Sequence, residues 1–142
     1  MAKVAVFSGP GLTQEIRAGR HGVVADEPVE AGGTDTGPDP YSLLLGALGA
    51  CTSMTLKLYA RRKGWPLSDV VVELSFSRVY AEDCVNCDDP RARLDRVDRR
   101  IVLHGPLDEA QAARLAEIAK KCPVHKTLMA GLNVVDEVVR HE

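Results

Sequence analysis

Two isolated cysteines are the residues of this chain best suited to carry out chemistry. Cys51 lies in the run Gly-Ala-Leu-Gly-Ala-Cys-Thr-Ser-Met, and Cys122 opens the run Cys-Pro-Val-His-Lys. The nucleophilic form of cysteine is the thiolate, which is favoured by a nearby cation or a helix N-terminus. Oxidation converts it to a sulfenic acid and then to a disulfide. A free cysteine is also a good small apolar core residue, so both interpretations stay open for each.

Local sequence makes Cys122 the more acidic of the two thiols. Pro123 suits the first position of a helix, which would leave Cys122 as the N-cap residue. The helix dipole and the free N–H groups there stabilise an anion and lower the pKa of a thiol. His125 and Lys126 follow closely and add positive charge. Cys51, in the middle of a predicted helix, needs a cation from elsewhere in the fold.

Cys84 and Cys87 form a Cys-x-x-Cys pair in a polar segment. Such a pair is half of a zinc site, and completing it needs two more ligands, for example His21 or His104. The same pair fits a redox couple or two surface thiols. All three interpretations stay open, and the pair is only a weak metal candidate.

A long helix is predicted to carry Cys51. Asp39 can cap it with Pro40 in its first turn, and Gly64 and Pro66 end it. Residues 43–55 are apolar or small on every side, and a helix of that kind is buried on every side. A chain of 142 residues can hardly surround such a helix alone, so a partner subunit is expected.

The remaining elements predict an α+β fold. Strands are predicted at 3–8, 13–19, 21–27, 69–81, 93–104 and 132–139, and further helices at 107–121 and 124–130. Long antiparallel strands with helices segregated against them are typical of the α+β class. The length predicts a single domain covering residues 1–142.

Composition excludes several classes of function. The net charge is -2, and the short basic run Arg61-Arg62-Lys63 is explained by a helix end, where cations complement the dipole. We therefore expect no nucleic-acid partner.

The apolar run 43–51 is too short to span a bilayer, and no signal peptide begins the sequence. A cytoplasmic location is expected, in which cysteines are redox-active or bind metal more often than they form structural disulfides. No nucleotide-binding or metalloprotease motif appears, and no cofactor is expected.

The two cysteines and the loop before the helix resemble one family. The run Gly-Gly-Thr-Asp-Thr-Gly-Pro-Asp-Pro leads into the helix of Cys51, and Cys-Pro-Val-His-Lys-Thr-Leu begins 71 residues after that cysteine. This pattern resembles the OsmC/Ohr family, the osmotically inducible and organic hydroperoxide resistance proteins, over residues 11–139. The run Arg-His-Gly-Val-Val-Ala-Asp-Glu-Pro points to the OsmC-like subgroup. The resemblance implies an OsmC-like fold, with antiparallel sheets wrapped around a long buried central helix in an intertwined homodimer with shared active sites.

The resemblance also implies roles in a thiol peroxidase that reduces organic hydroperoxides. Cys51 matches the peroxidatic cysteine, and Cys122 matches the one that resolves its sulfenic acid to a disulfide. A dithiol or a lipoylated protein then reduces that disulfide. Arg17, with Arg20 as runner-up, matches the arginine whose charge lowers the pKa of the first thiol. We follow the resemblance in choosing Cys51 as the nucleophile, since a tertiary contact with an arginine cannot be seen in a sequence.

One position departs from the family pattern. The organic hydroperoxide branch has a glutamate ten residues before its first cysteine, where this chain has Tyr41. Without that carboxylate, peroxidase activity is expected to be weaker or the substrate to differ. The alternatives are a non-enzymatic redox-sensing or thiol-ligand-binding module on the same fold, and a metal-binding accessory protein that uses Cys84 and Cys87.

Overall fold

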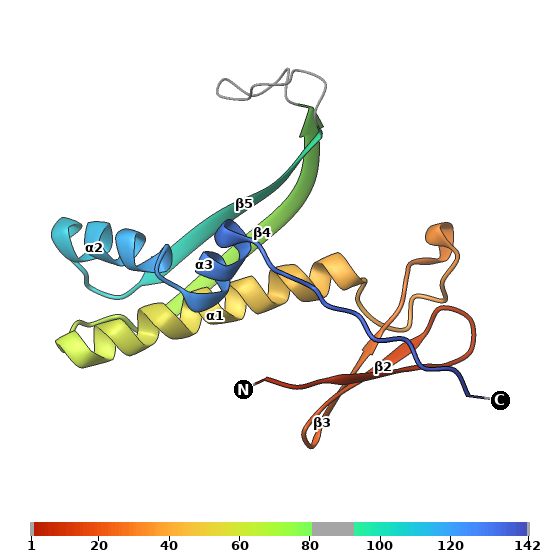
Figure 1. The fold of residues 1–142 in the computed structure, drawn as a ribbon. Coiled ribbons are helices and arrows are strands. Elements are labelled where there is room, and N and C mark those ends of the chain that lie inside the picture. Colours follow the sequence, from red (N-terminus) through yellow and green to blue (C-terminus); the bar gives the residue numbers. More distant parts are fainter. Residues whose placement is uncertain (1, 81–92, 142) are drawn as a thin grey trace. The chain divides into compact units, whose positions relative to one another are not determined.

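The computed structural model describes residues 2–80 and 93–141. Its elements are β1 Ala5–Ser8, β2 Gln14–Ala18, β3 His21–Ala25, a 3-10 turn Val29–Ala31, α1 Pro40–Lys63, β4 Asp69–Tyr80, β5 Arg93–His104, α2 Glu109–Ala119 and α3 Pro123–Ala130. Figure 1 shows helices together with antiparallel strands, which is the predicted α+β class. The order of strands and α-helices follows the prediction from the first strand to the short third helix. Cys84 and Cys87 lie outside the described residues.

The prediction of a strand at 132–139 is wrong for the single chain. Residues 131–141 form no helix or strand, and the valines at 134, 135 and 138 are 77%, 85% and 89% exposed. A strand persists only where a neighbouring edge takes its backbone hydrogen bonds. Among the described residues, no strand pairs with this segment.

The chain folds as two compact units. The first comprises Met1–Gly46 and Ser75–Val97, and the second comprises Ala47–Leu74 and Asp98–Glu142. The first unit holds an antiparallel sheet in the order β1-β2-β3, and β4 pairs with β5 in a second sheet. Arg17 lies opposite Gly22, and Ala18 lies opposite His21. The predicted hairpin is confirmed, with its tight turn at Gly19, whose φ of 60° suits a glycine.

A buried carboxylate orders the loop that leads into α1. Asp26 is 2% exposed. Its Oδ2 accepts the hydroxyls of Thr34 and Thr36 at 2.7 Å each, and their N–H groups at 3.2 and 3.1 Å. These hydrogen bonds, those from the two hydroxyls first, hold the pKa of Asp26 well below its usual range. The loop packs so tightly that a Cβ at Gly37 would lie 2.2 Å from the Val24 carbonyl oxygen.

Local chemistry sets both ends of α1 as predicted. The carboxylate of Asp39 accepts the N–H of Ser42 at 3.4 Å, so it caps the first turn. Gly64 ends the helix with a φ of 69°. The N–H of Trp65 donates to the carbonyl oxygen of Ala60 at 2.9 Å, which completes a Schellman motif.

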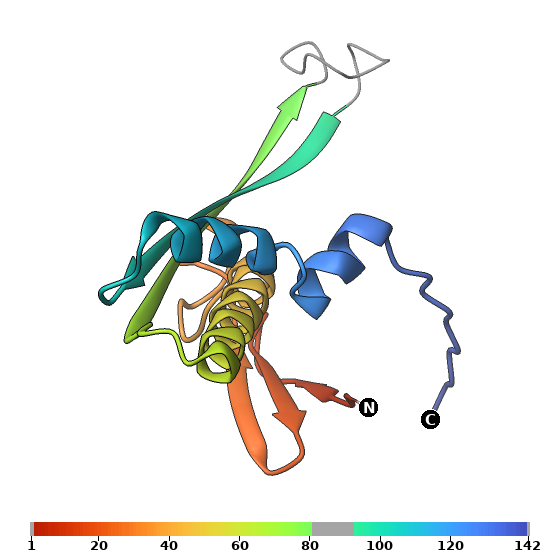
Figure 2. The same ribbon diagram turned by 90° about the vertical axis from the view of Figure 1, so that its left-hand side faces the viewer.

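The core of the second unit fixes α2 against the C-terminal half of α1 (Figure 2). Leu56 of α1 packs against Leu115, Ile118 and Ala119 of α2, and all four are buried. Asp108 and Gln111 start α2 with a reciprocal capping box. Because α2 is held on α1, Cys122, three residues beyond its end, is brought to α1 as well.

The single chain buries only one side of α1. Leu48, Gly49, Thr52, Leu56 and Ala60 are buried, whereas Met54 and Leu58 are 64% and 58% exposed. The prediction of burial on every side is therefore not met within one chain. By length and composition α1 is also apolar enough to cross a membrane, with a mean hydropathy of 1.4, although its longest uninterrupted apolar run is short.

Candidate thiol site

Cys51 and Cys122 lie together in the second unit. Cys51 is partly exposed on α1, and Cys122 is fully buried as the N-cap residue of α3, with Pro123 at the first helical position. Both are free thiols, and their side chains form a hydrogen bond with each other. The predicted cap geometry of Cys122 is confirmed.

The two thiols differ in acidity. Burial opposes ionisation of Cys122, but hydrogen bonds to its sulfur from the Cys51 thiol and from the N–H groups of His125 and Val124 lower its pKa, and the neighbouring Thr52 hydroxyl lowers it further. Burial raises the pKa of Cys51, and its hydrogen bond to Cys122 raises it further. Within one chain, negative charge is therefore favoured on Cys122, with Cys51 as the proton donor, which agrees with the local argument from the sequence.

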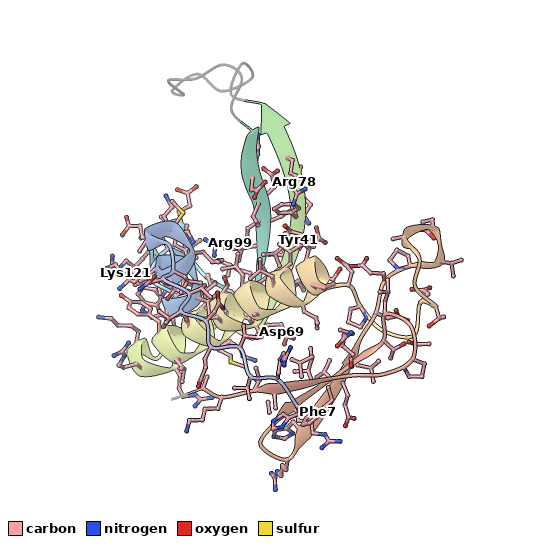
Figure 3. The ribbon with its side chains drawn as sticks, turned by 45° about the vertical axis from the view of Figure 1, so that its right-hand side comes forward. Phe7, Tyr41, Asp69, Arg78, Arg99 and Lys121 are labelled. Carbon is pink, nitrogen blue, oxygen red and sulfur yellow. The ribbon has the colours of Figure 1, made fainter. Side chains whose placement is uncertain are left out.

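A threonine and an arginine next to the thiols were not identified from the sequence. Thr52 is fully buried, and its hydroxyl donates to the Leu48 carbonyl oxygen at 2.7 Å. The hydroxyl oxygen of Thr52 in turn accepts a hydrogen bond from Nη1 of Arg99 at 3.0 Å. Arg99 extends from β5 to α1 for this contact (Figure 3). The positively charged side chain of Arg99 is therefore bonded directly to Thr52, the residue that follows Cys51.

The sequence did contain a signal for Arg99. Residues two apart in a strand share a face, and Arg99 shares its face with Ile101 and Leu103, which pack on the core. A cation in an apolar row needs a buried polar partner, and Thr52 is that partner. Only the tertiary structure could identify the partner.

His125 does not act as a second cation. Burial lowers its pKa, and the charges of Arg99 and Lys120 lower it further. The imidazole is therefore neutral at about pH 7. The contribution of His125 to Cys122 is its backbone N–H and not the ring charge that the sequence suggested.

Arg17 and Arg20 belong to the first unit. Arg17 donates Nε to Glu15 at 2.9 Å, and its guanidinium lies 4.4 Å from the centre of the Phe7 ring. The hydrogen bond with Glu15 raises the pKa of Arg17. Arg20 is exposed in the hairpin turn. The thiols are in the second unit, so the role of either arginine toward Cys51 stays a prediction.

Tyr41, where the resemblance led us to expect a glutamate, has partners of its own in the first unit. Its hydroxyl accepts Nη2 of Arg78 at 2.7 Å, and its ring stacks on Phe76 with centroids 4.5 Å apart. Arg78 also pairs with Asp95 at 3.3 Å. Figure 3 labels Tyr41 and Arg78 side by side. In place of a carboxylate, this position has a phenol that binds an arginine.

The described residues contain no cluster of three or more His, Cys, Asp or Glu side chains able to hold a metal ion. The weak metal candidates, Cys84 and Cys87, lie outside those residues.

Comparison with known proteins identifies the family. Residues 33–135, well over half of the chain, match the protein-family model described as OsmC-like protein. The chain belongs to the OsmC family. Both cysteines of the thiol site lie within the matched OsmC region. No curated protein sequence gives a significant match.

Solved structures show the same fold. An OsmC-like protein from Mycoplasma pneumoniae is similar with a TM-score of 0.73 and 20% identity, covering 91% of this chain and 87% of that one. The organic hydroperoxide resistance protein OhrB of Bacillus subtilis is similar at 0.60 and 23%, covering 89% and 88%. An organic hydroperoxide resistance protein OsmC from Legionella pneumophila is similar at 0.64 and 18%, covering 89% and 87%. At these identities the likeness defines the OsmC fold and leaves the subgroup undetermined.

Proposed function

We propose that this OsmC-family chain is a thiol peroxidase that reduces organic hydroperoxides through Cys51 and Cys122. The observation that carries the proposal is the hydrogen-bonded pair of free thiols, one partly exposed and the other buried at a helix N-terminus. Family members named for organic hydroperoxide resistance share the fold and support this substrate class.

The two sulfurs have different roles in the first chemical step, because they differ in exposure and in acidity. Cys51 is the more accessible sulfur, so it meets the peroxide, and Cys122 accepts its proton through the hydrogen bond that joins them. The Cys51 thiolate then attacks one peroxide oxygen, and the O–O bond breaks. The alkoxide takes the proton from Cys122 and leaves as an alcohol, and Cys51 becomes a sulfenic acid.

The second step uses Cys122 as the nucleophile. Its thiolate, restored when the alcohol leaves, attacks the sulfur of the Cys51 sulfenic acid, and the S–O bond breaks to release hydroxide, which is protonated to water. Thr52 lowers the pKa of Cys122 and so favours the thiolate that makes this attack, and Arg99, bonded to Thr52, adds a positive charge next to it. A dithiol or a lipoylated protein then reduces the Cys51–Cys122 disulfide through a mixed disulfide and becomes a disulfide itself.

A homodimer with shared active sites completes the proposal. Met54 and Leu58 on α1, and the valines of 132–139, are apolar and exposed in one chain. Exposed apolar surface of this kind marks an interface, and a partner strand would supply the missing hydrogen bonds of 132–139. We propose that Arg17, or else Arg20, then supplies the cation that favours the Cys51 thiolate.

We also propose that the protein is cytoplasmic, a compartment in which free thiols persist. We propose no nucleic-acid partner and no membrane partner. The apolar surface of α1 is assigned to the partner subunit and not to lipid.

The test is turnover of cumene hydroperoxide with dithiothreitol for the wild type, Cys51→Ser and Cys122→Ser. We expect turnover by the wild type, none by Cys51→Ser, and a loss of about 100-fold or more for Cys122→Ser, which lacks the proton acceptor and the resolving sulfur. An inactive wild type with intact thiols, or full activity in Cys51→Ser, would refute the peroxidase.

Tyr41 motivates the second candidate, a redox-sensing module. Its phenol binds Arg78 where the family glutamate is expected. A sensor would be oxidised once at Cys51 by stoichiometric peroxide without repeated turnover when a dithiol is supplied. Multiple turnovers per subunit would exclude it.

A further inference from the structure

A cluster of cations surrounds one phenol in the second unit. Arg114 donates Nε to the Tyr59 hydroxyl at 3.1 Å. The charged groups of Arg114, Arg62 and Lys63 lie 5.7, 5.9 and 5.7 Å from the centre of the Tyr59 ring. The charge of Lys121 is also close enough to lower the pKa of the phenol, after the larger effect of Arg114. We call these five residues the Tyr59 cluster.

The sequence explained the basic run 61–63 as an ordinary helix end. The structure adds Arg114 from α2 and Lys121 from the segment after α2, so the cations come from three places in the chain. The core between α1 and α2 holds them together. This convergence exceeds what the helix dipole of α1 accounts for.

The positive charge of the Tyr59 cluster is largely unbalanced. Arg114 pairs with Glu117 at 2.7 Å. Within the part of the chain that the structure describes, no carboxylate forms an ion pair with Arg62, Lys63 or Lys121, and all three are exposed. A chain with a net charge of -2 thus presents a strongly positive surface here.

The Tyr59 cluster borders the thiol site. Lys121 directly precedes Cys122 in the chain and is labelled in Figure 3. Tyr59 follows Cys51 on α1 by eight residues, or about 12 Å at the rise of an α-helix. The Tyr59 cluster is therefore close to both cysteines along the chain, through α1 to Cys51 and through Lys121 to Cys122.

We propose that the Tyr59 cluster docks the acidic surface of a dithiol protein that reduces the Cys51–Cys122 disulfide. The inference rests on the proposed function and adds the chemistry of the partner. Opposite charges steer the encounter and raise its rate, and no single deep contact is needed. The exposed cations spread over three segments, which fits a protein surface better than one small anion. A cavity of about 80 Å³ in the same unit has an apolar lining of Leu56, Ile101, Leu103, Leu115 and Ala116, and it offers no polar site for such an anion.

The exchange itself assigns the two sulfurs. A donor thiolate attacks the more exposed sulfur, that of Cys51, and the S–S bond breaks with Cys122 leaving as the stabilised thiolate. The second donor thiol then displaces Cys51 from the mixed disulfide. The donor ends as a disulfide, and Cys51 and Cys122 are both reduced.

The test measures binding of a reduced lipoyl domain of net negative charge to the full chain, and the rate at which that domain reduces the oxidised chain. The variants are Lys63→Glu and Lys121→Glu. The matched control is Arg100→Glu, which has the same charge change on an exposed side chain that pairs with Glu73. Thermal unfolding of each variant checks its fold.

We expect both variants to lose about tenfold in affinity and in reduction rate with the domain, and the control to lose little. Wild-type binding should weaken steeply as salt rises from about 0.01 to 1 M. The rate of reduction by neutral dithiothreitol should be the same in all proteins. A failure of dithiothreitol to reduce the wild-type chain would contradict the proposed peroxidase and would say nothing about docking.

Equal losses in the control, or wild-type binding that ignores salt, would overturn the docking surface. The proposal would also be wrong if Lys63→Glu slowed reduction by the small anionic dithiol dihydrolipoate but not reduction by the lipoyl domain. The Tyr59 cluster would then be a site for a small anion. The salt dependence keeps the proposal testable even if a variant unfolds.

Discussion

The two units each bury a group that is suited to carry negative charge, and they treat it in opposite ways. In the first unit, hydroxyl and N–H donors of one loop surround the Asp26 carboxylate, including Thr34 and Thr36. In the second, Cys122 has Thr52 and two backbone N–H groups, and it also shares a hydrogen bond with Cys51. Asp26 is held ionised and serves structure, whereas the thiol pair keeps a proton that can move. The number of fixed donors distinguishes a structural anion from a reactive one.

Substitution of Arg99 or Thr52, which lie beside the thiol pair, should change the acidity of Cys122 more than any other change considered below. In a Cys51→Ser background, Arg99→Gln or Thr52→Val should raise the pKa of Cys122 by about one unit, since a nearby cation is lost in the first and the hydroxyl that anchors this cation in the second. The ultraviolet absorbance of the thiolate, followed against pH, measures this shift.

Arg100→Gln is the matched control, because Arg100 is adjacent in the strand but pairs with exposed Glu73. An equal shift in the control would show that the effect is one of net charge alone. No shift in either Arg99→Gln or Thr52→Val would remove both residues from the account of the site.

A smaller effect is expected at Asp26. Asp26→Asn should lower the midpoint of thermal unfolding by several degrees near neutral pH, because the amide offers an N–H₂ group to donors that need an acceptor. The folded pKa of Asp26 is depressed, so its stabilisation is present above the unfolded value of about 3.9 and is lost as pH falls below it.

The difference in midpoint between wild type and Asp26→Asn should therefore shrink as the pH falls from about 6 to 3. A difference that stays constant over this range would show that Asp26 does not stabilise the fold as a carboxylate. Thr13→Val, a hydroxyl deletion on a residue that does not bond Asp26, serves as the control.

Features that depend on a few neighbouring residues could be predicted from the sequence. Asp39 and Gly64 set the ends of α1, and Pro123 places Cys122 at the start of α3, because caps and helix-breaking residues act over one turn. The hairpin at Gly19 has the same origin. The paired cysteine motifs also predicted the family correctly.

Features that need distant parts of the chain could not be predicted. The contact of Arg99 with Thr52 joins residues 47 positions apart, and no local pattern specifies it. The Tyr59 cluster draws its cations from separate segments. The segment 132–139 is rich in valine, as strands are, but a strand there requires an edge that the described residues do not supply. Sequence patterns predict which side chains need a partner, and only the fold identifies the partner.

The most direct test of the central claim is the fate of Cys51 in the Cys122→Ser variant after one equivalent of cumene hydroperoxide. We expect one sulfenic acid per subunit, trapped at Cys51 by dimedone and located by mass spectrometry, with none in Cys51→Ser. A variant that consumes the peroxide without labelling Cys51, or a wild type that forms no Cys51–Cys122 disulfide with the same peroxide, would contradict the proposed chemistry.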